Sequence, residues 1–127
     1  MRVGYHNHDY IFDQFNGKML WNILADGTPQ RVILQLDTGN ASLHPGVNVV
    51  ELLERNRGRT ATIHIKPYSS TNPAAYIGDD ELDWPRIIEL CRTTAGTEWF
   101  IVEYEVEGTP PLQALEDNYK RFKDLLA

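Results

Sequence analysis

The sequence has a single cysteine, Cys91, and no long hydrophobic run in its 127 residues. One cysteine cannot form an internal disulfide, which is typical of a reducing compartment, and we expect a cytoplasmic protein. The longest apolar stretches, at 32–34 and 99–102, are far shorter than the roughly 20 residues of a membrane-spanning helix. No cationic start precedes an apolar segment, so no signal peptide is expected.

Positive charge is also scarce. The chain has 12 Lys and Arg against 18 Asp and Glu, a net charge of −6, which disfavours a nucleic-acid partner. No G-x-G-x-x-G or Walker loop follows a predicted strand, so the usual nucleotide-binding signals are missing. The hydrophobic fraction of 42% is sufficient for a packed core, and the length predicts one domain over residues 1–127.

Four β-rich segments, at 2–8, 31–37, 61–66 and 98–105, alternate with segments of helical periodicity. The helices are predicted near 19–25, 49–53, 84–91 and 112–126, with Asn48 capping the second and Asp83 the third. Alternation at this spacing predicts an α/β protein with a parallel four-stranded sheet and helices on one face. The segment 67–80, rich in Ser, Asn, Pro and Gly, is predicted to be a loop.

Polar side chains occur near the carboxyl ends of the four predicted strands. Because side chains alternate between the faces of a strand, these residues share one face of the sheet. Ligands of parallel α/β proteins bind at the carboxyl ends of the strands, which is where these residues lie. Two imidazoles and two carboxylates form a donor set that suits Mn²⁺, Co²⁺, Zn²⁺ or Mg²⁺. Each residue also has an ordinary interpretation as a polar strand end, and Asp37 in particular as the cap of the following turn. The four residues are His6, Asp37, His64 and Glu103.

Several motifs resemble, in order and spacing, the sugar phosphate isomerase/epimerase family of xylose isomerase-like TIM barrels. The resemblance covers nearly the whole chain but matches only the C-terminal half of such a barrel, and it implies a (β/α)₄ half-barrel. A complete (β/α)₈ barrel needs about 250 residues. The motifs are Gly4-Tyr5-His6-Asn7-His8-Asp9, Leu36-Asp37-Thr38-Gly39-Asn40, His64-Ile65-Lys66, Ile77-Gly78-Asp79 before Leu82-Asp83-Trp84, and Ile101-Val102-Glu103.

The family binds a divalent metal through Glu, Asp, His and Glu on four successive strands. The resemblance therefore implies Asp37, His64 and Glu103 as metal ligands, and it places His6 where the epimerases usually have the first Glu. It also implies that Glu103 and His6 are the catalytic pair, acting on a proton beside a metal-polarised carbonyl. The substrate contacts that it implies are His8, Asn40 and Lys66.

A half-barrel leaves one sheet face and both sheet edges uncovered. Ile33, Thr62 and Ile101 would then meet solvent, and unpaired edges favour association, so we expect a homo-oligomer, with a dimer closing eight strands. The expected substrate is a small sugar or keto-sugar. Three alternatives remain open: a non-catalytic half-barrel that self-assembles, a keto-inositol or keto-sugar dehydratase, and the apurinic endonuclease branch of the fold, which the acidic charge disfavours.

Overall fold

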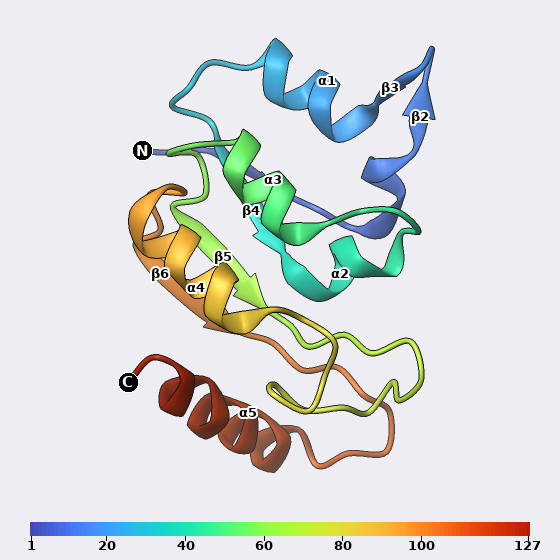
Figure 1. Ribbon diagram of the computed structural model, residues 1–127, viewed down its shortest axis with the longest axis vertical. Coiled ribbons are helices and arrows are strands. Elements are labelled where there is room, and N and C mark those ends of the chain that lie inside the picture. Colours follow the sequence, from blue (N-terminus) through green and yellow to red (C-terminus); the bar gives the residue numbers. More distant parts are fainter.

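The computed structural model describes residues 1–127 and contains a four-stranded parallel sheet in the order β1-β4-β5-β6 (Figure 1). The predicted parallel sheet is confirmed, but each strand is shorter than its predicted segment. The reason is visible at two strand ends, where the side chains of Asn7 and Thr38 bind the backbone of Asp37 and Lys66 in place of a neighbouring strand. The strands are β1 (Gly4–His6), β4 (Ile33–Asp37), β5 (Thr62–Ile65) and β6 (Trp99–Val102).

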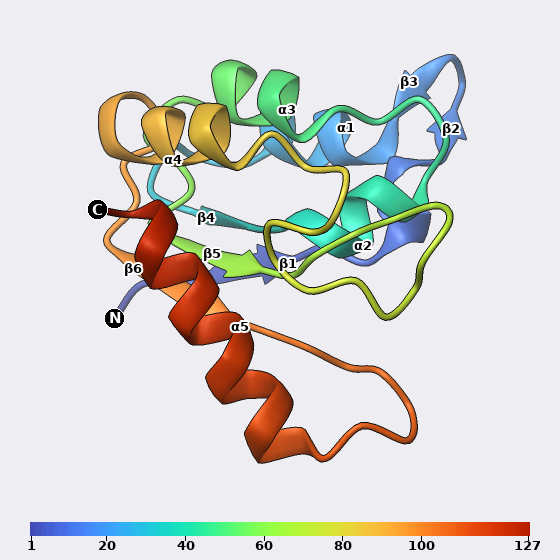
Figure 2. The ribbon, with the colours of Figure 1, turned by 60° about the horizontal axis from the view of Figure 1, so that its bottom comes forward.

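Helices lie in every connection between the strands, as the periodicity predicts. Figure 2 shows α1, α3 and α4 as a layer over one face of the sheet. The short helix α2, which begins directly after β4, was not predicted separately. The helices are α1 (Leu20–Gly27), α2 (Thr38–Leu43), α3 (Val49–Arg55), α4 (Trp84–Thr93) and α5 (Pro111–Leu125).

Two small elements follow β1 and were not predicted. The first is a 3₁₀ helix, η1 (Asp9–Phe12), and the second is a hairpin of β2 (Gln14–Phe15) and β3 (Lys18–Met19). The hairpin turns at Asn16 and Gly17, which have φ of 50° and 77°. An Asn-Gly pair is the strongest short-range hairpin signal, so the sequence contained the information for this element.

The predicted helix caps are confirmed. The Asn48 carboxamide oxygen accepts the N–H of Val50 at 2.9 Å, and the Asp83 carboxylate accepts the N–H of Arg86 at 3.1 Å. These bonds satisfy donors that a helix start otherwise leaves free. Gly96, just past α4, has the positive φ of 71° that the end of a helix commonly requires.

The core lies between the sheet and the helix layer. Leu34, Leu36, Ile63 and Ile65 are the buried alternate residues of β4 and β5. Apolar residues recur along 84–91 at the spacing i, i+3, i+4 and i+7, which predicts an apolar stripe on α4. All four are buried and pack with other helices over these strands, so the stripe is confirmed. They are Trp84, Ile87, Ile88 and Cys91.

Helix α5 is only partly buried. Phe122 packs between Trp84 and Phe100, with ring centroids 6.0 and 5.4 Å apart. Leu112 and Tyr119 recur at the same helical spacing as Phe122 but are 84% and 55% exposed. They remain exposed because α5 lies at the outer side of β6, where no further element covers it (Figure 1).

The open sheet face agrees with the prediction of an incomplete barrel. Ile101 is 37% exposed, and Ile33 and Thr62 are half-buried. Strands β1 and β6 each have one neighbour, so each has an unpaired edge. No helix combines the length and the apolar composition that crossing a membrane requires.

The loop of residues 66–83 joins β5 to α4 and is irregular, as predicted, but it is held in place by side chains. Asp80 accepts the N–H groups of Tyr68 and Gly78 and the indole N–H of Trp84. The buried Asn118 of α5 accepts the N–H of Ile77 at 2.9 Å. These acceptors anchor the loop beside the strand ends.

A buried guanidinium joins α1 to the sheet. Arg59 donates to the carbonyl of Ala25 at 2.6 Å, to the hydroxyl of Thr28 at 2.7 Å and to the carbonyl of Val32 at 3.1 Å. The Ala25 carbonyl belongs to the last turn of α1, where the helix dipole favours a cation. Arg59 therefore caps the C-terminal end of α1 with a buried side chain.

We expect Arg59→Met to lower the free energy of unfolding by about 1–3 kcal/mol, because three acceptors lose a charged donor. Urea denaturation followed by circular dichroism measures the change. The matched control is Arg57→Met, since Arg57 is exposed and should contribute within about 0.5 kcal/mol. Equal effects of the two substitutions would contradict this role of Arg59.

Candidate metal centre at the strand ends

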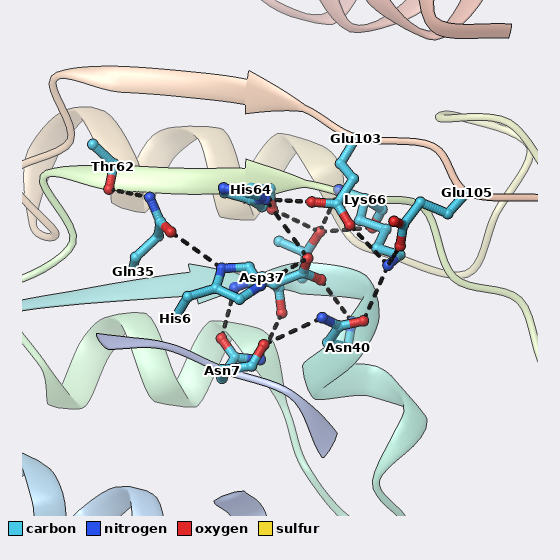
Figure 3. A network of polar contacts seen from close by, with 11 residues as sticks. His6, Asn7, Gln35, Asp37, Asn40, Thr62, His64, Lys66, Glu103 and Glu105 are labelled. Atoms are coloured by element: carbon cyan, nitrogen blue, oxygen red, sulfur yellow. Dashed lines mark hydrogen bonds and ion pairs between the residues drawn. The ribbon is translucent and has the colours of Figure 1, made fainter. Parts of the chain in front are cut away.

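The carboxyl ends of three adjacent strands bring together His6, Asp37 and His64 (Figure 3). One ligand atom from each residue lies within 4.8 Å of the others. Strand pairing produces this arrangement, because Asp37 lies opposite His64 in the register of β4 and β5, and β1 runs beside β4. Three of the four predicted metal ligands therefore form one cluster that could hold a metal ion.

The carboxylate of Asp37 has two oxygens with different surroundings. Its side chain is fully buried, and Oδ1 accepts the N–H of Asn40 at 2.7 Å, which caps α2. Oδ2 is buried without a hydrogen-bond partner, and it lies 3.9 Å from both His6 Nε2 and His64 Nδ1. A buried carboxylate oxygen without a partner is costly. A divalent cation between this oxygen and the two imidazoles would satisfy it, so these residues fit a metal.

Burial is the main cause that raises the pKa of Asp37 to about 6, and the nearby charge of Glu103 acts in the same direction. The Asn40 N–H and the charges of Lys66 and His64 lower the pKa but do not offset burial. Near pH 7 the group is mostly ionised, at a cost in free energy. A bound cation would remove that cost.

Glu103 follows β6 and belongs to the same polar network, although it is not one of the clustered three. It accepts a hydrogen bond from His64 Nδ1 and another from Lys66 Nζ at 2.9 Å. The hydrogen bond from His64, together with that of Lys66, lowers the pKa of Glu103 to about 2 despite partial burial. The proton on His64 Nδ1 thus lies between two groups that were both predicted to bind metal.

Lys66 connects Glu103 to two further residues. Its ammonium group donates to Asn40 Oδ1 at 3.2 Å and to Glu105 at 2.8 Å. Asn40 and Lys66, both predicted substrate contacts, therefore lie beside the metal-ligand cluster. His8, the third, is exposed and stacks on Tyr10; its ring also packs edge-on against His6, with centroids 5.3 Å apart, but it is not one of the clustered ligands.

Sequence reasoning assigned no role to Asn7, which holds Asp37 in place. The fully buried Asn7 accepts the N–H of Asp37 at 2.7 Å and donates to its carbonyl at 3.2 Å. The backbone carbonyl of Asn7 accepts from Asn40 at 3.2 Å. The sequence signal for these hydrogen bonds is the position of Asn7 directly after a strand. That signal is weak, because polar residues often end strands.

His6 is half-buried, and burial, with the nearby His64, lowers the pKa of its imidazole. The ring is therefore neutral near pH 7, which is the form that binds metals. Its Nε2 faces Asp37, and its Nδ1 lies 3.1 Å from the side-chain oxygen of Gln35.

No family model and no curated protein matches this sequence. Two solved structures share its fold, and both are described as a sugar phosphate isomerase/epimerase from Parabacteroides distasonis. The first is 22% identical with a TM-score of 0.78, and the match covers 94% of this chain and 46% of that one. The second is 20% identical with a TM-score of 0.65, and the match covers 97% of this chain and 44% of that one.

The chain thus spans less than half the length of the proteins that it matches. Its parallel sheet, helix layer and open sheet edges are those of an incomplete barrel. The chain is an α/β half-barrel whose fold is similar to about half of a sugar phosphate isomerase/epimerase barrel.

Proposed function

We propose that this chain is the metal-binding half of a divalent-metal-dependent sugar isomerase or epimerase. The observation that carries the proposal is the cluster of His6, Asp37 and His64 around a buried carboxylate oxygen that has no partner. The position of the cluster at the carboxyl ends of parallel strands supports it, because barrel enzymes act there. The fold shared with two sugar phosphate isomerase/epimerase structures supports the substrate class, a small sugar or keto-sugar.

His6, Asp37 and His64 would hold Mn²⁺, Co²⁺, Zn²⁺ or Mg²⁺, with Glu103 as a fourth ligand. When bound, the metal polarises a substrate carbonyl and makes the neighbouring C–H group more acidic. Glu103 would act as the base, because the hydrogen bonds from His64 and Lys66 keep its carboxylate ionised near pH 7. Lys66 keeps this carboxylate in position.

A single base fits isomerisation. Glu103 would take a proton from one carbon and return it to the neighbouring carbon on the same face, while a hydroxyl proton passes between the two substrate oxygens and the carbonyl changes place. Epimerisation at one carbon needs a second group on the opposite face. Both ring nitrogens of His6 are directed at Gln35 and Asp37, so we assign His6 to the metal, and its catalytic role stays a prediction.

A second copy of the chain is the proposed partner that completes the barrel. Each copy has one unpaired edge on β1 and another on β6, and a two-fold axis would pair the β1 edge of each copy with the β6 edge of the other. Apolar surface lies beside the β6 edge, in a groove of about 380 Å³ between β6 and α5. The apolar residues that line it are Phe100, Val102, Leu112, Leu115 and Tyr119.

We predict that the purified chain binds Mn²⁺ or Co²⁺ with release of protons, because a metal displaces the proton shared by His64 and Glu103. Affinity should fall as the pH falls through about 6, where Asp37 takes up a proton. Isothermal titration calorimetry in buffers of different ionisation enthalpy measures both effects. Asp37→Asn should abolish binding, whereas Asp124→Asn, an exposed control, should preserve it.

Loss of binding in Asp37→Asn should not reflect unfolding. The pKa of Asp37 is higher in the folded chain than its ordinary 3.8, so the stabilisation from protonation is complete below pH 3.8 and is lost as the pH rises through about 6. At pH 7 the amide should make the metal-free chain more stable by about 1–3 kcal/mol. A wild-type chain that binds no metal at pH 7.5 would refute the proposed centre.

We predict that the metal-loaded chain exchanges a substrate C–H proton with solvent. Incubation in D₂O with a panel of ketoses, aldoses and their phosphates, followed by NMR, detects this step before any product is identified. Glu103→Gln should slow exchange by about 100- to 10,000-fold. The exposed control Glu107→Gln should not. Exchange that persists in Glu103→Gln would remove Glu103 as the base, and metal binding without exchange on any sugar would indicate a non-catalytic half-barrel.

We predict that the chain sediments as a dimer at micromolar concentration. The double substitution Leu112→Lys and Leu115→Lys should produce a monomer, because it places two cations in the groove beside β6. Leu43→Lys is the control, since Leu43 is exposed but does not line the groove. A monomeric wild-type chain, or a dimer that survives the double substitution, would contradict the proposed assembly.

A further inference from the structure

A row of polar side chains crosses three neighbouring strands beside the metal centre. Gln35 of β4 pairs in register with His6 of β1, and its Oε1 lies 3.1 Å from His6 Nδ1. The amide nitrogen of Gln35 donates to Thr62 Oγ1 of β5 at 2.7 Å. Figure 3 shows the three side chains in line, with the ring of His6 between Gln35 and Asp37.

The two nitrogens of His6 have different surroundings. A neutral imidazole has one N–H donor and one acceptor nitrogen, and a carboxamide oxygen only accepts. The proton therefore belongs on Nδ1, where Gln35 accepts it. Nε2 then has its lone pair free, and this nitrogen lies 3.9 Å from the unpartnered oxygen of Asp37.

We propose that Gln35, oriented by Thr62, is a positioning residue that holds His6 in the Nδ1–H tautomer and keeps Nε2 available as a metal ligand. The reversed amide would donate to Nδ1 and place the ring proton on Nε2, between the imidazole and Asp37, where it would oppose a cation. Ligands whose second nitrogen is fixed by a neighbouring acceptor are oriented in this way in metal sites generally.

The metal part of this inference rests on the proposed function, but the tautomer is a property of the metal-free chain. Long-range ¹H–¹⁵N NMR distinguishes a protonated imidazole nitrogen from an unprotonated one, and His6→Asn identifies the His6 signals. We expect the proton on Nδ1 in the wild-type chain and in Gln35→Glu, whose carboxylate can only accept. Gln35→Met has a similar length and no acceptor, and it should shift the ring proton toward Nε2.

Cobalt binding provides a second readout, followed by visible absorption of the 127-residue chain. Gln35→Met should weaken Co²⁺ binding by about 10- to 100-fold, the usual effect of losing such a partner. Gln35→Glu keeps an acceptor and should bind Co²⁺ about as tightly as the wild-type chain. If Gln35 only filled space, Gln35→Glu and Gln35→Met would not differ in this way. Thr62→Val against Thr62→Ser gives the same contrast without changing Gln35, in case Gln35→Met does not fold.

A ring proton on Nε2 in the wild-type chain would overturn the inference, and so would a tautomer that is the same in wild type, Gln35→Met and Thr62→Val. If the tautomer follows Gln35 while Co²⁺ does not bind, the positioning of His6 stands and the proposed metal function fails. If Co²⁺ binds and neither substitution changes the tautomer or the affinity, the metal centre stands and the role of Gln35 is refuted.

Discussion

The buried carboxylate of Asp37 is the group around which the polar contacts at the strand ends are arranged. Asn7 holds its backbone, and the N–H of Asn40 satisfies one of its oxygens. The other oxygen has no partner and faces the imidazoles of His6 and His64. Burial without full compensation raises the pKa of Asp37 to about 6, so the metal-free chain holds a charge that it does not fully stabilise. Such a destabilised group is expected at a functional site rather than in an ordinary core.

The charge of Glu103 is paired more completely than the charge of Asp37. Lys66 contacts the carboxylates of Glu103 and Glu105, and His64 donates to Glu103. The pKa of Glu103 is accordingly lowered while that of Asp37 is raised, although both are carboxyl groups at ends of nearby strands. Burial is the main cause that raises the pKa of Asp37, which has one backbone N–H as a donor, whereas the donors His64 and Lys66 lower the pKa of Glu103. Environment, rather than residue type, therefore moves the pKa values of these two carboxyl groups in opposite directions.

The open sheet face allows this centre to be reached and also leaves the chain incomplete. In a closed barrel, side chains on that face would be covered by the opposite strands, whereas here Ile101 and Trp99 are 37% and 66% exposed. Apolar side chains also remain exposed along α5, beside an unpaired strand edge. Apolar surface next to a free edge favours association with another sheet. The same missing elements therefore account for both the accessible site and the proposed assembly.

The sequence by itself determined the features that depend on near neighbours in the chain. Strand and helix alternation, the caps Asn48 and Asp83, and the polar residues at the strand ends follow from local pattern, because side-chain periodicity and backbone capping act over a few residues. The tertiary structure alone decided which of those groups meet. The hydrogen bonds of Asn7 to Asp37, the pairing of Glu103 with Lys66 and the line from Thr62 through Gln35 to His6 each join residues that lie on, or directly after, different strands. Such contacts depend on strand order, register and curvature, which long-range packing sets.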